Sequence, residues 1–390
     1  MVPGWRELLT GRSRAGRRLR LPAVLLVLAF VAAVAAEATE PETPERGAAS
    51  RAAARASAAP PAIARRLGLT RGHLRRGSDP SALPGNVLIA DRSNSRLLIV
   101  SPRGQIVWRF PRRGDLRRGQ SFRVPDDAFF ADGGRRIVAT QEDDFVISVI
   151  DVATHRIVYR YGHPGVHGAT ADHLFNPDDA MLGRGGALMS ADIKNCRLIA
   201  IRPPAHRVLR QLGATGACFH DPPRAFDSPN GVFPTAYGNS LVTEIGGDWV
   251  DLLAPNGSLL AATHPPGFSY PSDTNEVRPG ILLSVDYTRP GAIEEFDWQG
   301  RLRWRFAPTG RDALDKPSLA LPLPNGDVIA NDDHNDRVIV VDPRTGRIVW
   351  QYGHTGRRGR KPGFLNTPDG VDLAPPHSLL SRFPAPALPR

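Results

Sequence analysis

The sequence lacks the short motifs that mark the common nucleotide-, zinc- and serine-dependent enzymes. It contains no Gly-rich phosphate-binding loop, no His-Glu-x-x-His segment and no nucleophile elbow. Its apolar run from Leu21 to Ala36 has sixteen residues, whereas a membrane-spanning helix needs about 20. The chain therefore carries neither a standard catalytic signature nor an ordinary transmembrane segment in its sequence pattern.

Lysine is nearly absent, because three Lys stand against 47 Arg, which we interpret as a coding bias toward GC-rich codons. The positive charge is also unevenly placed. Residues 1–83 hold 14 Arg against six acidic residues, a net charge of +8, while residues 84–390 have a net charge of only +3. The high isoelectric point thus belongs mostly to the N-terminal part, and it does not indicate nucleic-acid binding.

The N-terminal residues 1–36 have the composition of a secretory leader. A head with six Arg precedes the apolar run, and small residues suited to cleavage follow it. We predict a signal peptide, with an uncleaved signal anchor as the alternative, and either form places the rest of the chain outside the cytoplasm. Residues 37–83, rich in Ala, Pro, Arg and Glu, are predicted to form a disordered linker.

The remainder of the chain is built from repeats of three short β-branched runs separated by turn residues. The pattern is clearest in Gly326–Gly353, where Asp333-His334-Asn335-Asp336 and Pro343 to Gly346 form the turns. A three-stranded meander of this size cannot bury its faces alone and requires neighbours of the same kind. Five further copies are present, at residues 85–110, 136–162, 187–213, 240–264 and 281–306.

A second repeated marker lies between these copies and gives the period. It is Pro followed by a small polar residue and an apolar run, at Pro125, Pro177, Pro229, Pro271, Pro317 and Pro368, with steps of 52, 52, 42, 46 and 51 residues. Such periods with four strands each predict an all-β, six-bladed β-propeller over residues 84–376, followed by a C-terminal tail at 377–390. Because the last marker has no copy after it, the strand at about Gly370–Ala374 is expected to complete blade 1 and close the ring.

Three copies share the element Asp-x-x-Asn-x-Arg, at Asp91 to Arg96, Asp192 to Arg197 and Asp332 to Arg337. With the Pro marker and the Gly turn, this element resembles the NHL-repeat six-bladed propellers, from about Gly85 to Pro375. The resemblance implies the fold and no single function, because that family is functionally mixed. The residues themselves favour an Asx-stabilised turn with an Asp–Arg pair.

A second resemblance comes from Val341 to Trp350, which is similar to the tryptophan-docking motif of quinoprotein propellers. Trp108, Trp304 and Tyr159 occupy the matching place in other blades, where an aromatic ring is expected to pack between neighbouring blades. The adjacent cysteine pair of quinone-dependent dehydrogenases is missing, so a quinone cofactor is not expected.

One face of the predicted ring collects histidines and carboxylates, because the crossovers between blades and the hairpins between the second and third strands lie on the same side. We call this side the top face. The binding residues predicted there are His163, His334, His354, Asp127, Asp179 and Asp369. Histidine at a channel mouth can act as a base, a nucleophile or a metal ligand, and the carboxylates leave room for a divalent cation at the central channel. The alternative is structural, with Asp capping the inner strands and His following Gly in a repeated loop.

The function predicted from these features is a non-catalytic, extracytoplasmic module that binds a small molecule or a protein through its top face. The alternative is a secreted enzyme that uses the same face, such as an aryl-sulfate sulfotransferase, or a metal-dependent lactonase or lyase. Catalysis would require His163, His334 and His354 to point into the central mouth. We expect a monomer that contacts the membrane only through its N-terminal segment.

The two cysteines, Cys196 and Cys218, are predicted to form a disulfide. Thiols are usually oxidised in exported proteins, and both residues belong to the top face of blade 3 and the crossover that leaves it. The alternative is two unrelated buried thiols.

Overall fold

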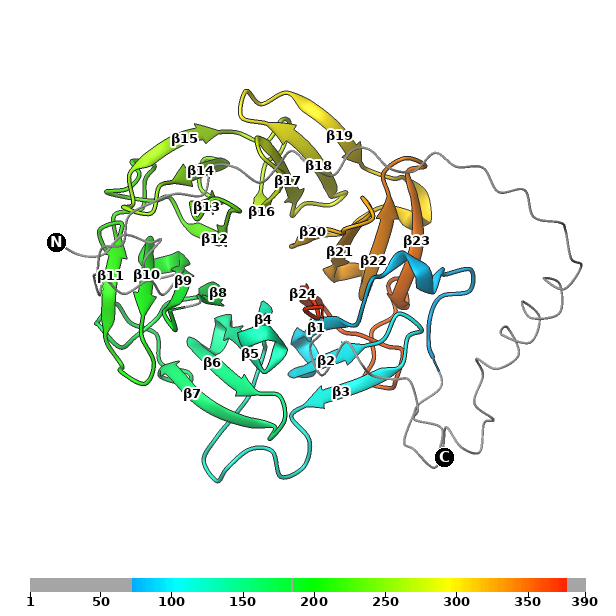
Figure 1. The fold of residues 1–390 in the computed structure, drawn as a ribbon, viewed down its shortest axis with the longest axis horizontal. Coiled ribbons are helices and arrows are strands. Elements are labelled where there is room, and N and C mark those ends of the chain that lie inside the picture. Colours follow the sequence, from blue (N-terminus) through cyan, green and yellow to red (C-terminus); the bar gives the residue numbers. More distant parts are fainter. Residues whose placement is uncertain (1–71, 184, 377–390) are drawn as a thin grey trace, which may run out of the picture. The chain divides into compact units, whose positions relative to one another are not determined.

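The computed structural model describes residues 72–183 and 185–376. The predicted signal peptide, the first part of the predicted linker and the C-terminal tail at 377–390 lie outside these residues. Within the described part of the chain, twenty-four strands form six four-stranded antiparallel sheets around a ring (Figure 1). In this part no helix is long and apolar enough to cross a membrane.

Each sheet is one blade, and its strands follow one another outward from the central axis. From the innermost strand outward, blade 1 consists of β24 (Pro368–Leu373), β1 (Val87–Asp91), β2 (Arg96–Val100) and β3 (Ile106–Phe110), and blade 2 consists of β4 (Ala128–Ala131), β5 (Arg136–Gln141), β6 (Val146–Asp151) and β7 (Arg156–Gly162). Blade 3 consists of β8 (Pro177–Leu182), β9 (Leu188–Asp192), β10 (Arg197–Ile201) and β11 (Val208–Leu212), and blade 4 consists of β12 (Pro229–Pro234), β13 (Ser240–Glu244), β14 (Trp249–Leu253) and β15 (Leu259–Thr263). Blade 5 consists of β16 (Pro271–Arg278), β17 (Ile281–Asp286), β18 (Ala292–Asp297) and β19 (Leu302–Phe306), and blade 6 consists of β20 (Ala320–Pro322), β21 (Val328–Asp332), β22 (Arg337–Asp342) and β23 (Arg347–Gly353).

The ring closes through blade 1, as the phase of the Pro markers predicts. Strand β24 pairs antiparallel with β1, with Val371 opposite Ile89 and Leu373 opposite Val87. In Figure 1 the red β24 lies beside the blue β1, so one blade contains strands from both ends of the propeller. This pairing removes the free edge that an open ring would leave on β1.

Aromatic residues of the outer strands join neighbouring blades, which confirms their predicted packing role. The indole Nε1 of Trp108 in blade 1 donates to the Val152 carbonyl of blade 2 at 3.1 Å. Trp350 in blade 6 donates to the Pro102 carbonyl of blade 1 at 2.8 Å. Each ring therefore buries a large apolar surface and also satisfies its polar atom across the blade boundary.

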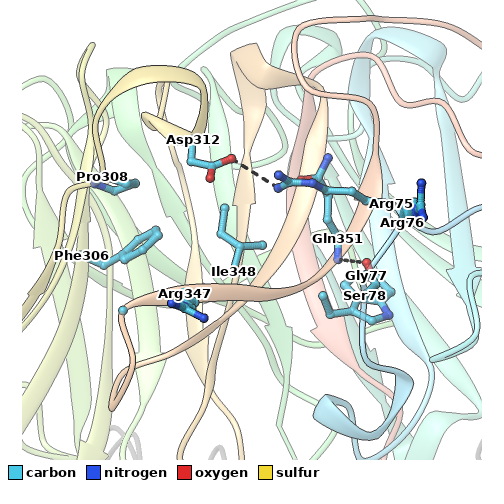
Figure 2. Close-up of a pocket in the computed structure, with 12 residues that line it drawn as sticks. Arg75, Arg76, Gly77, Ser78, Phe306, Pro308, Asp312, Arg347, Ile348 and Gln351 are labelled. Atoms are coloured by element: carbon cyan, nitrogen blue, oxygen red, sulfur yellow. Dashed lines mark hydrogen bonds and ion pairs between the residues drawn. The ribbon is translucent and has the colours of Figure 1, made fainter.

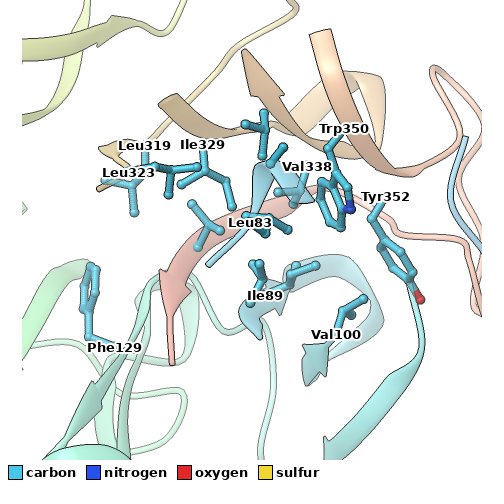
Figure 3. Packing of buried hydrophobic residues seen from close by; sticks show 14 of the residues in the cluster. Leu83, Ile89, Val100, Phe129, Leu319, Leu323, Ile329, Val338, Trp350 and Tyr352 are labelled. Carbon is cyan, nitrogen blue, oxygen red and sulfur yellow. The ribbon is translucent and has the colours of Figure 1, made fainter. Parts of the chain in front are cut away.

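The predicted linker is wrong over its last twelve residues, because residues 72–83 pack against the propeller. Leu74 forms a β-bridge with Tyr352, and a short 3-10 turn at Pro80–Ala82 is capped by Asp79. Figure 3 shows Leu83 among Ile89, Val338 and Trp350 in the buried cluster. The prediction rested on the mean composition of residues 37–83, in which the few apolar residues that pack against the propeller, such as Leu74 and Leu83, carry little weight.

Candidate functional site

The Asp-x-x-Asn-x-Arg element forms a buried clamp at the top of three blades. In blade 3, Asp192 accepts hydrogen bonds from Asn195 Nδ2 and Arg197 Nε, both at 2.8 Å. The guanidinium of Arg197 also donates to the His173 carbonyl in the crossover that enters the same blade. Blades 1 and 6 repeat the arrangement at Asp91, Asn94 and Arg96, and at Asp332, Asn335 and Arg337. The element holds hairpin and crossover together, which is the structural role that the residues favour.

A second set of carboxylates lines the central channel at the starts of the innermost strands. These groups are at most 5% exposed, and they are Asp126, Asp127, Asp178, Asp179, Asp273 and Asp369. Asp127, Asp179 and Asp273, from blades 2, 3 and 5, each offer a carboxylate oxygen within 4.8 Å of the other two. The Oδ1 atom of each of these three residues is buried and has no hydrogen-bond partner. A buried carboxylate oxygen without a partner lowers the stability of the fold, so these oxygens require a bound cation or protonation.

The backbone turns these carboxylates toward the axis through irregular strand starts. The pairing register shifts between Asp178 and Ala180 and between Pro271 and Thr274, at the positions where Asp179 and Asp273 lie. Gly231 provides the space between them, because a Cβ atom on it would lie 2.4 Å from Asp273 Oδ1. In blades 3 and 5 the residues of the Pro marker thus form a bulge at which Asp179 and Asp273 lie.

Arg92 is the cation that lies beside the outer part of this cluster. It contacts Asp126 at 3.2 Å, Asp369 at 3.0 Å, Glu142 at 2.9 Å and Asp143 at 2.6 Å. Burial favours protonation of Asp369, but Arg92 overcomes it and lowers the pKa of that carboxyl group. With four carboxylates around it, Arg92 is not available to bind an anionic ligand.

The inner three carboxylates have no comparable cation among the described residues. Burial raises the pKa of Asp127, Asp179 and Asp273 well above the usual range, and neighbouring carboxylates raise it further. A hollow of about 70 Å³ lies over the cluster around Arg92; of the three inner carboxylates only Asp127 lines it, together with Asp178, Tyr270 and Tyr287.

The opposite ends of the same innermost strands are apolar. Phe129, Met181, Phe233 and Leu321 line a hollow of about 390 Å³ there. The channel is therefore polar where the inner strands begin and apolar where they end.

The structure does not bring the three predicted histidines to the carboxylates. His163 Nε2 lies 2.9 Å from Asp172 Oδ2, and its ring stacks on His173. The ring of His354 lies 4.3 Å from that of Phe364. His334 lies nearest to the channel, with its ring 6.5 Å from Tyr287, but its Nδ1 faces Asp315 at 3.9 Å. All three are exposed in the top-face loops, and none lines the channel cavity.

Sequence reasoning missed several groups at this site. The repeat pattern does not mark Arg92, because only blade 1 has an arginine directly after the acid or amide that ends the second strand. Glu142, Tyr270 and Tyr287 likewise come from single blades. Asp126 and Asp178 could have been found, since each precedes a predicted Asp in the Pro-Asp-Asp marker.

Cys196 and Cys218 are joined in a disulfide, with their Cα atoms 5.2 Å apart. Cys196 follows the 3-10 turn of blade 3, and Cys218 lies in the crossover to blade 4. The bond therefore fixes this crossover against blade 3.

A further pocket, of about 350 Å³, lies at the outer side of blades 5 and 6, away from the channel (Figure 2). The segment 75–78 forms one wall, and Phe306, Pro308 and Ile348 form the other. Its acid and base are already paired, because Arg75 contacts Asp312 at 3.3 Å and also donates to Gln351. This pocket consequently offers no orphaned group comparable to those of the channel.

Comparisons with known proteins bear on the fold. A protein of unknown function from Bacteroides caccae superposes with a TM-score of 0.52 at 17% identity, over 74% of this chain and 98% of that one. The chain folds as a six-bladed β-propeller. A structure from the nidogen–laminin complex gives a TM-score of 0.49 at 15% identity, over 74% and 98% of the two chains. Virginiamycin B lyase from Staphylococcus aureus gives 0.42 at 15% identity, over 58% and 69%. No family model and no curated protein sequence matches the chain.

Proposed function

We propose that the propeller is an extracytoplasmic binding module whose central channel holds a divalent cation at the top face. A small molecule or a protein partner would bind over this cation and complete its coordination with oxygen atoms. The leader-like residues 1–36 and the disulfide support export, since disulfides persist mainly in oxidising compartments.

The observation that carries the proposal is the set of three orphaned oxygens on Asp127, Asp179 and Asp273. A fold that needed these residues only as strand caps would pair both of their oxygens, as it does in the clamps. Here the carboxylates converge from three blades, and Gly231 keeps the space between two of them open. A bound cation would satisfy all three oxygens at once.

The donor set points to a hard cation. Every ligand offered at this position is a carboxylate oxygen, which suits Ca²⁺ and Mg²⁺ rather than metals that prefer nitrogen or sulfur. Ca²⁺ takes six to eight oxygen ligands, so three protein carboxylates leave positions for water or for a partner. We infer binding rather than catalysis because the predicted histidines lie in loops outside the channel cavity.

Calorimetric titration of chelator-treated full-length protein with CaCl₂ and MgCl₂ tests the cation site. We expect a saturable heat in the parent protein and none in the double variant Asp179→Asn/Asp273→Asn. Asp221→Asn is the matched control, because Asp221 is paired with Arg224 outside the channel, and it should bind like the parent. Absence of heat in the parent, or equal binding by the double variant, would refute the proposal.

Export is tested by fusing alkaline phosphatase, which is active only outside the cytoplasm, behind residue 376 in a bacterial host. The fusion should be active, and deletion of residues 1–36 should abolish the activity without lowering the amount of fusion protein. Activity that survives the deletion would refute the export signal.

A further inference from the structure

Blade 4 departs from the clamp at the position where blades 1, 3 and 6 carry arginine. In those blades the acid at the end of the second strand lies opposite Arg at the start of the third, as Asp192 lies opposite Arg197. In blade 4 the corresponding pair is Glu244 and Trp249. Glu244 is fully buried, yet the guanidinium that neutralises its counterparts is replaced by an indole ring.

Blade 4 also adds a second buried acid two residues further along the third strand. Asp251 stands where the clamp blades have Leu98, Ile199 and Ile339, and it is fully buried. Blade 5 has an acid at the same place, but Glu294 lies opposite Arg305 and binds it. Asp251 lies opposite Ala262 instead. Neither of its carboxylate oxygens has a hydrogen-bond partner.

A histidine from the crossover completes the group. His220 Nδ1 lies 3.0 Å from Glu244 Oε1 and 3.9 Å from Asp251 Oδ2. Its ring stacks on Trp249 at 3.9 Å with an interplanar angle of 7°, so the residue that displaces the arginine also orients the imidazole. The disulfide at Cys218, two residues earlier, anchors the loop that carries His220.

We propose that His220, Glu244 and Asp251 bind a divalent transition metal ion, with Zn²⁺ as the best match to their chemistry. Their three ligand atoms lie within 4.8 Å of one another, and one nitrogen with two carboxylates is a set that Zn²⁺ accepts. The proposed channel site offers only carboxylate oxygens, which favour Ca²⁺ or Mg²⁺, so we expect the two sites to bind different ions. Three protein ligands leave a fourth tetrahedral position for water or an incoming ligand atom.

A proton shared by the two carboxyl groups is the competing way to neutralise them. Burial and the neighbouring Asp251 raise the pKa of Glu244 to about 10. That response is expected of two buried acids with no cation between them. A metal ion would replace this proton and would give an orphaned oxygen of Asp251 a partner.

Cobalt substitution distinguishes the two. Chelator-treated full-length protein without a polyhistidine tag is titrated with Co²⁺, and the visible d–d absorption of the bound ion is recorded. We expect one equivalent to give a saturable spectrum that Zn²⁺ abolishes by competition. His220→Ala should lose the spectrum at stoichiometric Co²⁺, whereas the channel variant Asp179→Asn/Asp273→Asn should retain it.

His163→Ala is the matched histidine control, because His163, Asp172 and His173 form an exposed group that could also hold a metal. It should leave the spectrum unchanged. Absence of the spectrum in the parent protein would favour the shared proton and overturn the proposal. Loss in His163→Ala with retention in His220→Ala would also overturn it, by moving the metal to the exposed group. Circular dichroism of His220→Ala, a loop substitution, checks that the fold persists.

Discussion

Blade 3 buries two carboxylates in opposite ways. Asp192, at the outer end of the hairpin, accepts hydrogen bonds from Asn195 and Arg197, and all of these groups come from the same blade. Asp179, on the channel wall, is equally buried but receives only the backbone N–H of Val232, and its Oδ1 has no partner. Two aspartates of one blade are thus equally buried, but only the carboxylate of Asp192 has hydrogen-bond partners for both of its oxygens.

On our proposal, this difference separates carboxylates that stabilise the fold from carboxylates that bind a cation. A buried acid that is paired with an arginine stabilises its loop, and removal of either partner leaves an uncompensated buried charge. A buried acid without a cation weakens the fold until a cation arrives, and the binding free energy then adds to stability. Replacing a carboxylate should therefore lower the free energy of unfolding where the carboxylate stabilises the fold, and raise it in the cation-free protein where the carboxylate binds a cation.

The largest effect is expected from breaking the clamp. Arg197→Ala leaves Asp192 buried and unpaired, and it should lower the free energy of unfolding by about 3–5 kcal/mol, measured by urea denaturation. Arg224→Ala removes an arginine from an exposed, solvent-screened pair and should leave the urea midpoint almost unchanged. Equal effects of the two substitutions would contradict the structural role of the clamp.

A smaller effect of opposite sign is expected in the channel. Asp273→Asn replaces one of three converging buried carboxyl groups by a neutral amide, so it should stabilise the chelator-treated protein by about 1 kcal/mol, or roughly 2 °C in Tm. Excess Ca²⁺ should reverse the order, because only the parent protein gains stability from the cation. The same substitution in the clamp, Asp192→Asn, should destabilise under both conditions. A lower Tm for Asp273→Asn in chelator would assign Asp273 to the fold.

The last effect is a pH dependence at Asp372, which lies further along β24 and is satisfied by the backbone rather than by an arginine. Its carboxylate accepts from Phe130 N at 2.7 Å, yet burial raises its pKa to about 7. Between pH 4 and 7 the folded state holds a proton that the unfolded state has released, so stability falls as pH rises through this range. Asp372→Asn, which stays neutral, should gain stability relative to the parent between pH 5 and pH 8, as measured by urea midpoints.

Asp221→Asn is the control for this pH dependence. The hydrogen bonds from Arg224 lower the pKa of Asp221, so its contribution changes only below about pH 4. Its difference from the parent should stay constant from pH 5 to pH 8. A constant difference for Asp372→Asn as well would show that Asp372 does not titrate in this range.

The repeats carried most of the fold and part of the site. Six markers in phase were enough to predict the ring and its closure through β24, whereas the interblade roles of Trp108 and Trp350 were predicted from the resemblance to the tryptophan-docking motif. The same markers located Asp127 and Asp179, because a repeated Pro-Asp-Asp places side chains at equivalent points of the ring. Repetition is a property of the sequence, so these predictions required no knowledge of side-chain directions.

The remaining features depend on departures from the repeat. His163 and His354 follow similar Tyr-Gly-His loops, but local partners, Asp172 and Phe364, decide where each ring points. Arg92 acts across two blades on Asp369 and Glu142, and no periodicity marks such a contact. Asp251 becomes conspicuous only when its cross-strand neighbour is known to be Ala262. These details require register and packing, which the pattern of residue types does not specify.

The closure of blade 1 has a consequence for the order in which the protein can assemble. Residue 87 is synthesised long before residue 373, yet the two lie opposite each other in neighbouring strands. Until β24 arrives, β1 presents an unpaired edge and blade 1 consists of only three of its four strands, β1, β2 and β3. Contacts this distant in sequence form slowly, so we expect that shielding the edge of β1 during synthesis would raise the yield of folded protein.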